Sequence, residues 1–108
     1  MPNLTEPIVR EALDKFFDGT VSGNEGHADV DRLVINGTHI EFKVKIVHKH
    51  VIKVFDKKIT VYNLTTDVEG DFDVTNPAPD KLSYTIQIPG GSISVSLLDV
   101  VQLLATFA

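Results

Sequence analysis

The sequence contains no cysteine and no long run of apolar residues. Without cysteine, the chain has no disulfide bond, no thiol nucleophile and no zinc or iron–sulfur site with cysteine ligands. No run approaches the ~18 apolar residues of a transmembrane helix, so we expect no membrane span. No basic segment precedes an apolar one, as it would in a signal peptide, so we expect a cytoplasmic protein. A mature exported form would have the same composition.

The composition is otherwise that of an ordinary globular domain. Hydrophobic residues make up 43% and charged residues 23% of the 108 residues, which is typical of folded proteins. The 10 Lys and Arg residues against 15 Asp and Glu residues give a net charge of −5. A chain of this length usually forms one domain around one core, so we expect residues 1–108 to be a single domain.

Two segments have the pattern of helices. In residues 5–18 apolar side chains recur at helical spacing, Thr5 stands at the expected N-cap, and Gly19 follows the segment. Residues 97–107 predict a second helix after Ser96. This second helix is apolar on nearly all sides, which is typical of a helix buried in a core or in an interface.

Between the helices, apolar residues alternate with polar ones, as in antiparallel strands. Asn36-Gly37 predicts a type I′ hairpin turn that pairs Leu33 with Ile40. A long second hairpin follows Ile40, and two shorter strands flank Pro89-Gly90-Gly91. The sequence therefore predicts five antiparallel strands in chain order.

The charges on the long hairpin predict its register. A three-residue turn places Lys45 opposite Glu69 and Lys43 opposite Asp71, so that a row of lysines faces a row of acids. Each strand of this hairpin, about 17 residues if unbroken, would extend roughly 56 Å. A domain of 100 residues has a radius of gyration near 13 Å, so we expect the hairpin to bend, to protrude, or both.

These elements define an α+β fold. We expect an N-terminal helix, a five-stranded antiparallel meander with a long bent hairpin, and a C-terminal helix, with the helices on one face of a curved sheet. The order of elements resembles that of cystatin-like and helix-grip folds at the level of architecture, without a shared motif.

His48 and His50 lie two residues apart, so a strand places both on one face. Two imidazoles at this spacing can bind a metal, but a metal site needs further ligands, and the register brings only Leu64 and Thr66 close to them. We therefore interpret His48 and His50 as a weak polar site near a bend. We expect no metal, no cofactor and no catalytic residue; an enzyme would have to rest on this pair and the acidic residues.

Six of the eight lysines lie in residues 43–58, where Asp56 is the one acidic residue. Such a basic run can mark an anionic partner. The run lacks arginine, however, and Phe55 is its only aromatic residue, whereas nucleic-acid binders usually combine arginine with stacking aromatics. We expect no nucleic-acid partner.

The far end of the long hairpin carries apolar residues on both faces, and a strand apolar on both faces is normally covered on both. The last helix has a similar excess of apolar residues. One interpretation is that this helix covers the hairpin within one chain. The other is a contact between chains, for which we expect these residues: Val51, Phe55, Ile59, Val61, Leu98, Val101 and Leu104.

We therefore expect a non-enzymatic protein-interaction module that associates with itself, as a dimer by default, since one patch can then pack on its own copy. The alternative function is a binder of a small apolar ligand, held between the curved sheet and the helices.

Overall fold

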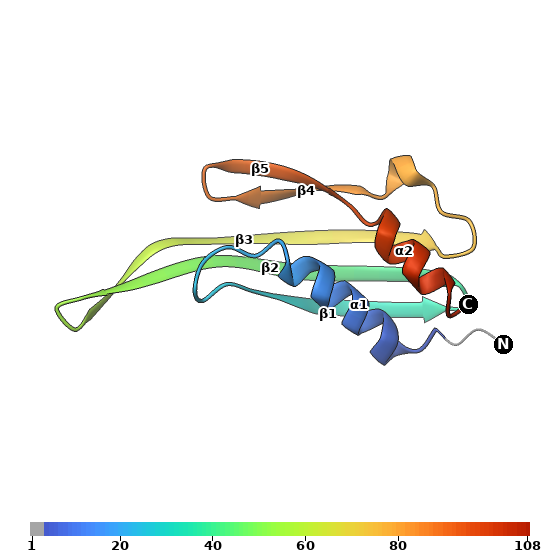
Figure 1. Ribbon diagram of the computed structural model, residues 1–108, viewed down its shortest axis with the longest axis horizontal. Helices are drawn as coiled ribbons and strands as arrows, with labels where there is room; N and C mark the ends of the chain where they lie inside the picture. Colours follow the sequence, from blue (N-terminus) through green and yellow to red (C-terminus); the bar gives the residue numbers. More distant parts are fainter. Residues whose placement is uncertain (1–3) are drawn as a thin grey trace.

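Figure 1 shows the elements of the computed structural model, which describes residues 4–108. In chain order they are α1 (Glu6–Asp18), β1 (His27–Asn36), β2 (His39–Val54), β3 (Lys57–Asp73), a 3₁₀ turn η1 (Pro79–Lys81), β4 (Ser83–Ile88), β5 (Gly91–Ser96) and α2 (Leu98–Ala105). This order confirms the predicted α+β fold. The expected single meander is divided, however, because β1, β2 and β3 form one antiparallel sheet and β4 and β5 form another.

The division falls between β3 and β4. Pro77 and Pro79 lie in the connection, and Pro79 opens the turn η1 that redirects the chain before β4. The hydroxyl end of Tyr84 in β4 lies so close to Gly70 in β3 that a Cβ at position 70 would collide with it. A tyrosine ring thus stands against β3 where a continuous ladder would require two backbones ~4.8 Å apart. β4 therefore packs beside β3 without a ladder.

The helices cover one face of the three-stranded sheet, as expected. Phe17 of α1 packs against Phe42 of β2, with ring centroids 6.3 Å apart. Side chains with no more than 1% of their surface exposed fill the layer between sheet and helices: Val9, Leu13, Phe17, Ile40, Val44, Ile46, Leu82, Ile86, Leu97, Val101 and Leu104. Burying a side chain of this size contributes about 1.5–3 kcal/mol, so this layer holds the fold together.

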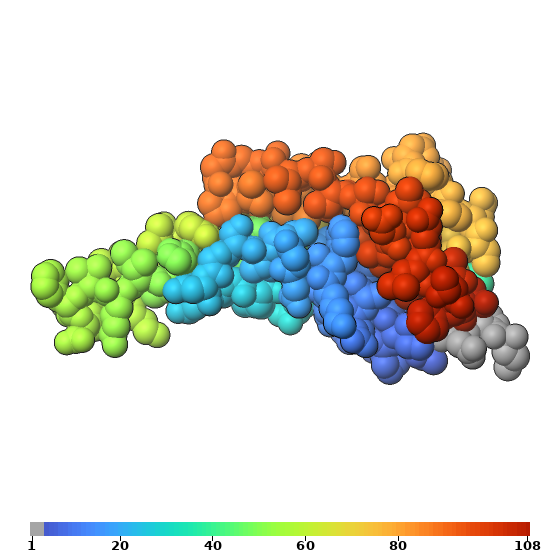
Figure 2. Space-filling view, viewed as in Figure 1, coloured from blue at the N-terminus to red at the C-terminus, as the bar shows by residue number. Residues whose placement is uncertain are grey.

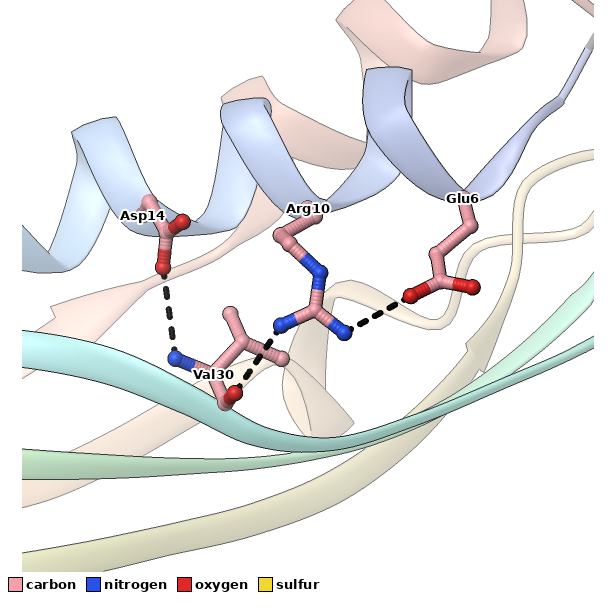
Figure 3. Close-up of polar contacts among 4 residues, drawn as sticks. All are labelled: Glu6, Arg10, Asp14 and Val30. Carbon is pink, nitrogen blue, oxygen red and sulfur yellow. Dashed lines mark hydrogen bonds and ion pairs between the residues drawn. The ribbon is translucent and has the colours of Figure 1, made fainter.

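Two polar side chains of α1 hydrogen-bond to the backbone of Val30 on the free edge of β1 (Figure 3). The backbone N–H of Val30 donates to Asp14 Oδ1 at 3.3 Å, and Arg10 Nη1 donates to the Val30 carbonyl at 3.0 Å. Glu6 holds the other end of the Arg10 guanidinium at 2.8 Å. A β-bulge lies between Val30 and Arg32. The helix thereby satisfies the backbone N–H and carbonyl of Val30, which an edge strand would otherwise leave open.

The turn of the first hairpin lies one residue later than predicted, which shifts the pairing of the two strands by two residues. Asn36 pairs with His39 and Ile35 pairs with Ile40, so that Gly37 and Thr38 form the turn. Gly37 has a φ of 63°, and Thr38 has no positive φ, which fits a type II′ turn with glycine in its first central position. The predicted type I′ turn was wrong. Since the shift is two residues, every side chain keeps its predicted face.

The long hairpin also differs from its predicted register, by two residues along the stretch from His39 to His50. A two-residue turn at Phe55-Asp56 replaces the three-residue turn, and Lys43 pairs with Glu69 while Lys45 pairs with Asp67. The predicted pairing of Lys45 with Glu69 was therefore wrong. The row of lysines still faces the row of acids, because charges that repeat every two residues match equally well after a shift of two.

A β-bulge interrupts the long hairpin between His50 and Val51. His50 pairs with Tyr62 and Val51 with Thr60, so Val61 is the extra residue on β3. Beyond the bulge the hairpin extends past the rest of the molecule (Figure 1), and we name residues 51–61 the arm. The molecule measures 58 × 26 × 18 Å with a radius of gyration of 15.9 Å, against about 13 Å for a compact chain of 100 residues.

Candidate interaction surface

The arm is a two-stranded ribbon that leaves the body of the protein at a well-supported base. β1 pairs with β2 only as far as the pair His27 and Val47. Beyond that pair, the loop before β1 takes over as the neighbour of β2: Lys49 N–H donates to the Ser22 carbonyl at 3.1 Å, and Glu25 N–H donates to the Lys49 carbonyl at 3.0 Å. The base of the arm is thus supported by a loop that runs beside it like a third strand.

Asn24 completes this support at the first residue of the arm. Its side-chain amide donates to the Val51 carbonyl at 2.7 Å and accepts from the Val51 N–H at 2.9 Å, as a strand residue would. Gly23 makes this approach possible, because it has a φ of 93° and a Cβ there would collide with the Lys49 carbonyl. Within the described residues, positions 52–54 and 57–59 pair only with each other.

The two histidines accept hydrogen bonds from the same loop. His48 Nδ1 accepts the Ser22 N–H at 3.0 Å, and His50 Nδ1 accepts the Asn24 N–H at 3.4 Å. The His50 ring also stacks on Tyr62, with centroids 5.8 Å apart and an interplanar angle of 22°. The histidines are therefore hydrogen-bonded residues at the bulged base of the arm, which is where the sequence placed its weak polar site.

His48 is the one fully buried polar side chain in the core as described from residue 4 to residue 108. Its Nδ1 accepts a hydrogen bond, so the ring proton resides on Nε2, and Nε2 finds no partner among those residues. No group of three or more His, Asp or Glu side chains in the same range is placed to hold a metal ion. No helix in that range is long and apolar enough to span a membrane.

The arm exposes apolar side chains on every side. The exposed fractions are 95% for Phe55, 53% for Val61, 47% for Ile59, 40% for Ile52 and 38% for Val54. Helix α2 does not reach the arm, because it packs at the opposite end of the molecule (Figure 1). The interpretation in which the last helix covers the hairpin within one chain is therefore wrong.

The structure divides the expected contact residues into two groups. Phe55, Ile59 and Val61 are exposed on the arm, and Val51 is half-buried at its base. Val101 and Leu104 are fully buried in the chain's own core, and Leu98 is half-buried beside them. A candidate surface for a partner therefore consists of the arm, to which Ile52 and Val54 belong as well.

The bulge changes which arm residues share a face. Ile59 pairs with Ile52 and Val51 pairs with Thr60, so Ile59 and Val51 lie on opposite faces of the arm. One face thus carries Ile52, Val54 and Ile59. The opposite face carries Lys53 directly across from Lys58. Like charges at directly opposed positions destabilise a ribbon, so the isolated arm contains an unfavourable pair.

Phe55 at the tip of the arm is also in an unfavourable conformation. Phe55 and Asp56 have φ values of 49° and 64°, as a type I′ turn requires at both central positions. Glycine, asparagine and aspartate accept this left-handed region, whereas an ordinary side chain costs about 1–2 kcal/mol there. The chain thus presents a strained aromatic residue to solvent in the turn of the arm, and the arm forms one end of the molecule (Figure 2).

An apolar groove lies between the two helices. Its volume is about 220 Å³, its apolar lining residues are Ile8, Ala12, Leu103, Leu104 and Phe107, and Glu11 and Lys15 line it as well. Leu103 is 54% exposed and Phe107 is 38% exposed. The sequence indicated an excess of apolar residues on the last helix, but it contained no signal that Leu103 and Phe107 would line a groove with α1.

A polar hollow of about 440 Å³ lies beside β3, near η1. There His39 Nε2 and Asp71 Oδ2 are 3.1 Å apart. Burial raises the pKa of Tyr84, and the negative charge of Asp71 raises that pKa further. The hydroxyl and the backbone N–H of Thr75 lower the pKa of Asp73. Tyr84 of β4 meets the acidic residues of β3 across the division between the two sheets, and sequence reasoning, which did not foresee that division, did not bring it to them.

Neither a protein-family model, nor a curated protein, nor a solved structure matches the chain.

Proposed function

We propose that this chain is a non-enzymatic interaction module that associates with copies of itself through the arm. The observation that carries the proposal is Phe55, which is 95% exposed at the tip of an arm whose other apolar residues are 38–53% exposed. Large apolar residues that gather exposed on one segment are typical of an interaction site. A second copy of the chain is the partner we propose, in its simplest form as a dimer.

The free edges of the arm support the same proposal. Its two strands have no neighbour in residues 52–54 and 57–59 within the described part of the chain. A two-stranded ribbon alone is marginally stable in water. The support of the arm ends at Asn24, whose side chain hydrogen-bonds to the backbone N–H and carbonyl of Val51. A partner that covers the arm would therefore supply contacts that its own chain does not.

Sedimentation velocity of the wild-type chain and of Phe55→Asp tests this proposal. We expect the wild type to sediment as an oligomer at micromolar concentration and Phe55→Asp as a folded monomer, because the exposed tip has no role in the core. Val34→Asp is the matched control, since Val34 is 41% exposed on β1 outside the arm and its replacement is expected to leave the association unchanged. A monomeric wild type contradicts the proposal.

Binding of a small apolar ligand is the second candidate function. The layer between sheet and helices is filled by buried side chains, so the observation that favours a ligand is the apolar groove between α1 and α2. In that case, Leu103→Lys would abolish ligand binding in native mass spectra and leave the sedimentation of the protein unchanged.

A further inference from the structure

We propose that the groove between α1 and α2 receives the arm tip of a second copy, so that copies associate head to tail. This inference rests on the proposed function, because it requires the arm to be the contact element. It adds the surface that the arm binds, the residue that enters it and the symmetry of the assembly.

The groove has the size and the lining that an aromatic side chain needs. Its volume is about 220 Å³, and an apolar cavity of roughly 150 Å³ is enough to hold a benzene ring. The walls are aliphatic and aromatic, with Leu103 and Phe107 partly exposed to water. Insertion of Phe55 would remove apolar surface from water on both partners at once.

The arm and the pair of helices that form the groove carry opposite net charges. In the arm, Lys53, Lys57 and Lys58 outweigh Asp56, for a net charge of +2. The two helices together carry five acidic and two basic residues, for a net charge of −3. Opposite charges steer two surfaces together and fix their orientation. A head-to-tail contact therefore brings a basic tip to a pair of helices with an acidic excess, while the two charged residues that line the groove, Glu11 and Lys15, pair with each other at 3.1 Å.

A symmetric contact between two arms has the opposite electrostatics. Lys53 and Lys58 already face each other within one arm, and a second arm would add its own lysines to the pair. Like charges brought together across an interface cost several kcal/mol in general. The charge pattern therefore favours the helices of the next copy over its arm.

The positions of the two surfaces exclude an intramolecular contact. The arm and the α1–α2 pair lie at opposite ends of the molecule (Figures 1 and 2), whose long dimension is 58 Å. One head-to-tail contact leaves a free arm on one copy and a free groove on the other. Contacts of this kind continue to add copies unless the rotation closes a ring, so we infer that assembly grows with concentration beyond a dimer.

A complementation experiment tests the pairing of arm and groove. Phe55→Asp removes the tip and keeps the groove, whereas Leu103→Lys places a positive charge in the groove and keeps the arm. Lysine is a good helix former, and a cation near the C-terminal end of a helix is favourable, so α2 is expected to persist. Val34→Lys is the control for a new charge elsewhere.

Each variant alone is expected to be a folded monomer by sedimentation velocity and circular dichroism. Their equimolar mixture is expected to form 1:1 dimers and nothing larger, since one intact arm then meets one intact groove. A mixture that stays monomeric overturns the inference. A Leu103→Lys chain that assembles like the wild type also overturns it, but leaves the proposed function standing. A wild-type chain that is monomeric contradicts both.

Cross-linking gives a second measurement that keeps Phe55 and the apolar lining of the groove intact. The chain has no cysteine, so Asp56→Cys at the tip and Lys15→Cys in the groove introduce one thiol each. On mild oxidation of a mixture, we expect the mixed disulfide to exceed the Cys–Cys products of either variant alone by roughly tenfold, as a close contact raises effective concentration. A dominant product between two Asp56→Cys chains would instead indicate an arm-to-arm contact and overturn the inference.

Discussion

At the scale of single residues, one aromatic side chain has a backbone conformation that aromatic residues disfavour. Phe55 occupies a left-handed turn position that suits asparagine or glycine, and its ring contributes little to the fold because it is 95% exposed. Strained, exposed residues of this kind are typical of positions held for a contact. A change that relieves the strain is therefore expected to separate stability from association.

Phe55→Asn is expected to raise the free energy of unfolding by about 1 kcal/mol, because asparagine accepts the left-handed region at lower cost. The same change is expected to weaken self-association, since it removes the apolar tip. Urea unfolding of dilute protein measures the first effect, and sedimentation measures the second. A loss of stability would show that Phe55 supports its own chain.

A second residue-scale prediction concerns Gly23. Both Gly23 and Gly90 have positive φ values, of 93° and 87°, but a Cβ at Gly23 would collide with the Lys49 carbonyl, whereas a Cβ at Gly90 would have open space. Gly90→Ala is therefore expected to cost about 1–2 kcal/mol, the backbone penalty alone. Gly23→Ala is expected to cost clearly more in the same urea titration. Equal costs would mean that the loop moves away from β2 freely.

A third residue-scale prediction concerns Asp73, whose pKa lies below its usual value because Thr75 donates both its hydroxyl and its backbone N–H to it, at 2.6 and 2.9 Å. The stability that Asp73 contributes is present above the carboxyl's unfolded pKa and is lost as the pH falls through its folded pKa. Thr75→Val removes the hydroxyl and is expected to raise the Asp73 pKa towards its usual value in an NMR titration. An unchanged pKa would contradict the assignment of its cause.

At the scale of elements, periodicity predicted which side chains share a face and left the offsets between strands open. Helix α1, the strands and helix α2 lie where their patterns placed them, since apolar spacing reports directly on burial. The charges of Lys43, Lys45 and their acidic partners repeat every two residues, so they fit two registers equally well. The turn at Phe55-Asp56 lacks the residues that usually mark a type I′ turn, and no local signal marks a bulge at Val61.

The candidate surface was predictable in part for the same reason. An apolar excess on the hairpin is a property of composition along one segment, and Phe55, Ile59 and Val61, which it indicated as contact residues, are exposed. Whether Val101 and Leu104 lie in a core or in an interface depends on which element packs against α2. The apolar pattern of a single helix does not give that information. The groove lined by Ile8 and Leu103 joins elements some 95 residues apart in the chain.

The prediction at the scale of elements concerns the exchange rates of backbone amides in the arm and in β2. Amides of the arm are expected to exchange much faster than those of the buried stretch of β2, because an isolated ribbon opens locally while the three-stranded part opens with the whole fold. At high protein concentration, the arm amides are expected to become protected, since a second copy then covers them. Arm amides as protected as the body in dilute solution would contradict an unsupported ribbon.

At the scale of the whole molecule, an acidic body carries a basic, apolar arm at one end and an apolar groove at the other. The arm holds +2 of a net charge of −5, which leaves −7 on the remaining residues. The elongated shape separates the two surfaces, so that a copy presents both to its neighbours. Shape and charge together describe a unit suited to association with its own kind.

Light scattering of the wild-type chain over a concentration series tests this claim most directly. The account predicts an average mass that rises steadily with concentration from the mass of one chain to more than two, since each added copy leaves one arm and one groove open. A mass equal to one chain across the whole series would contradict it.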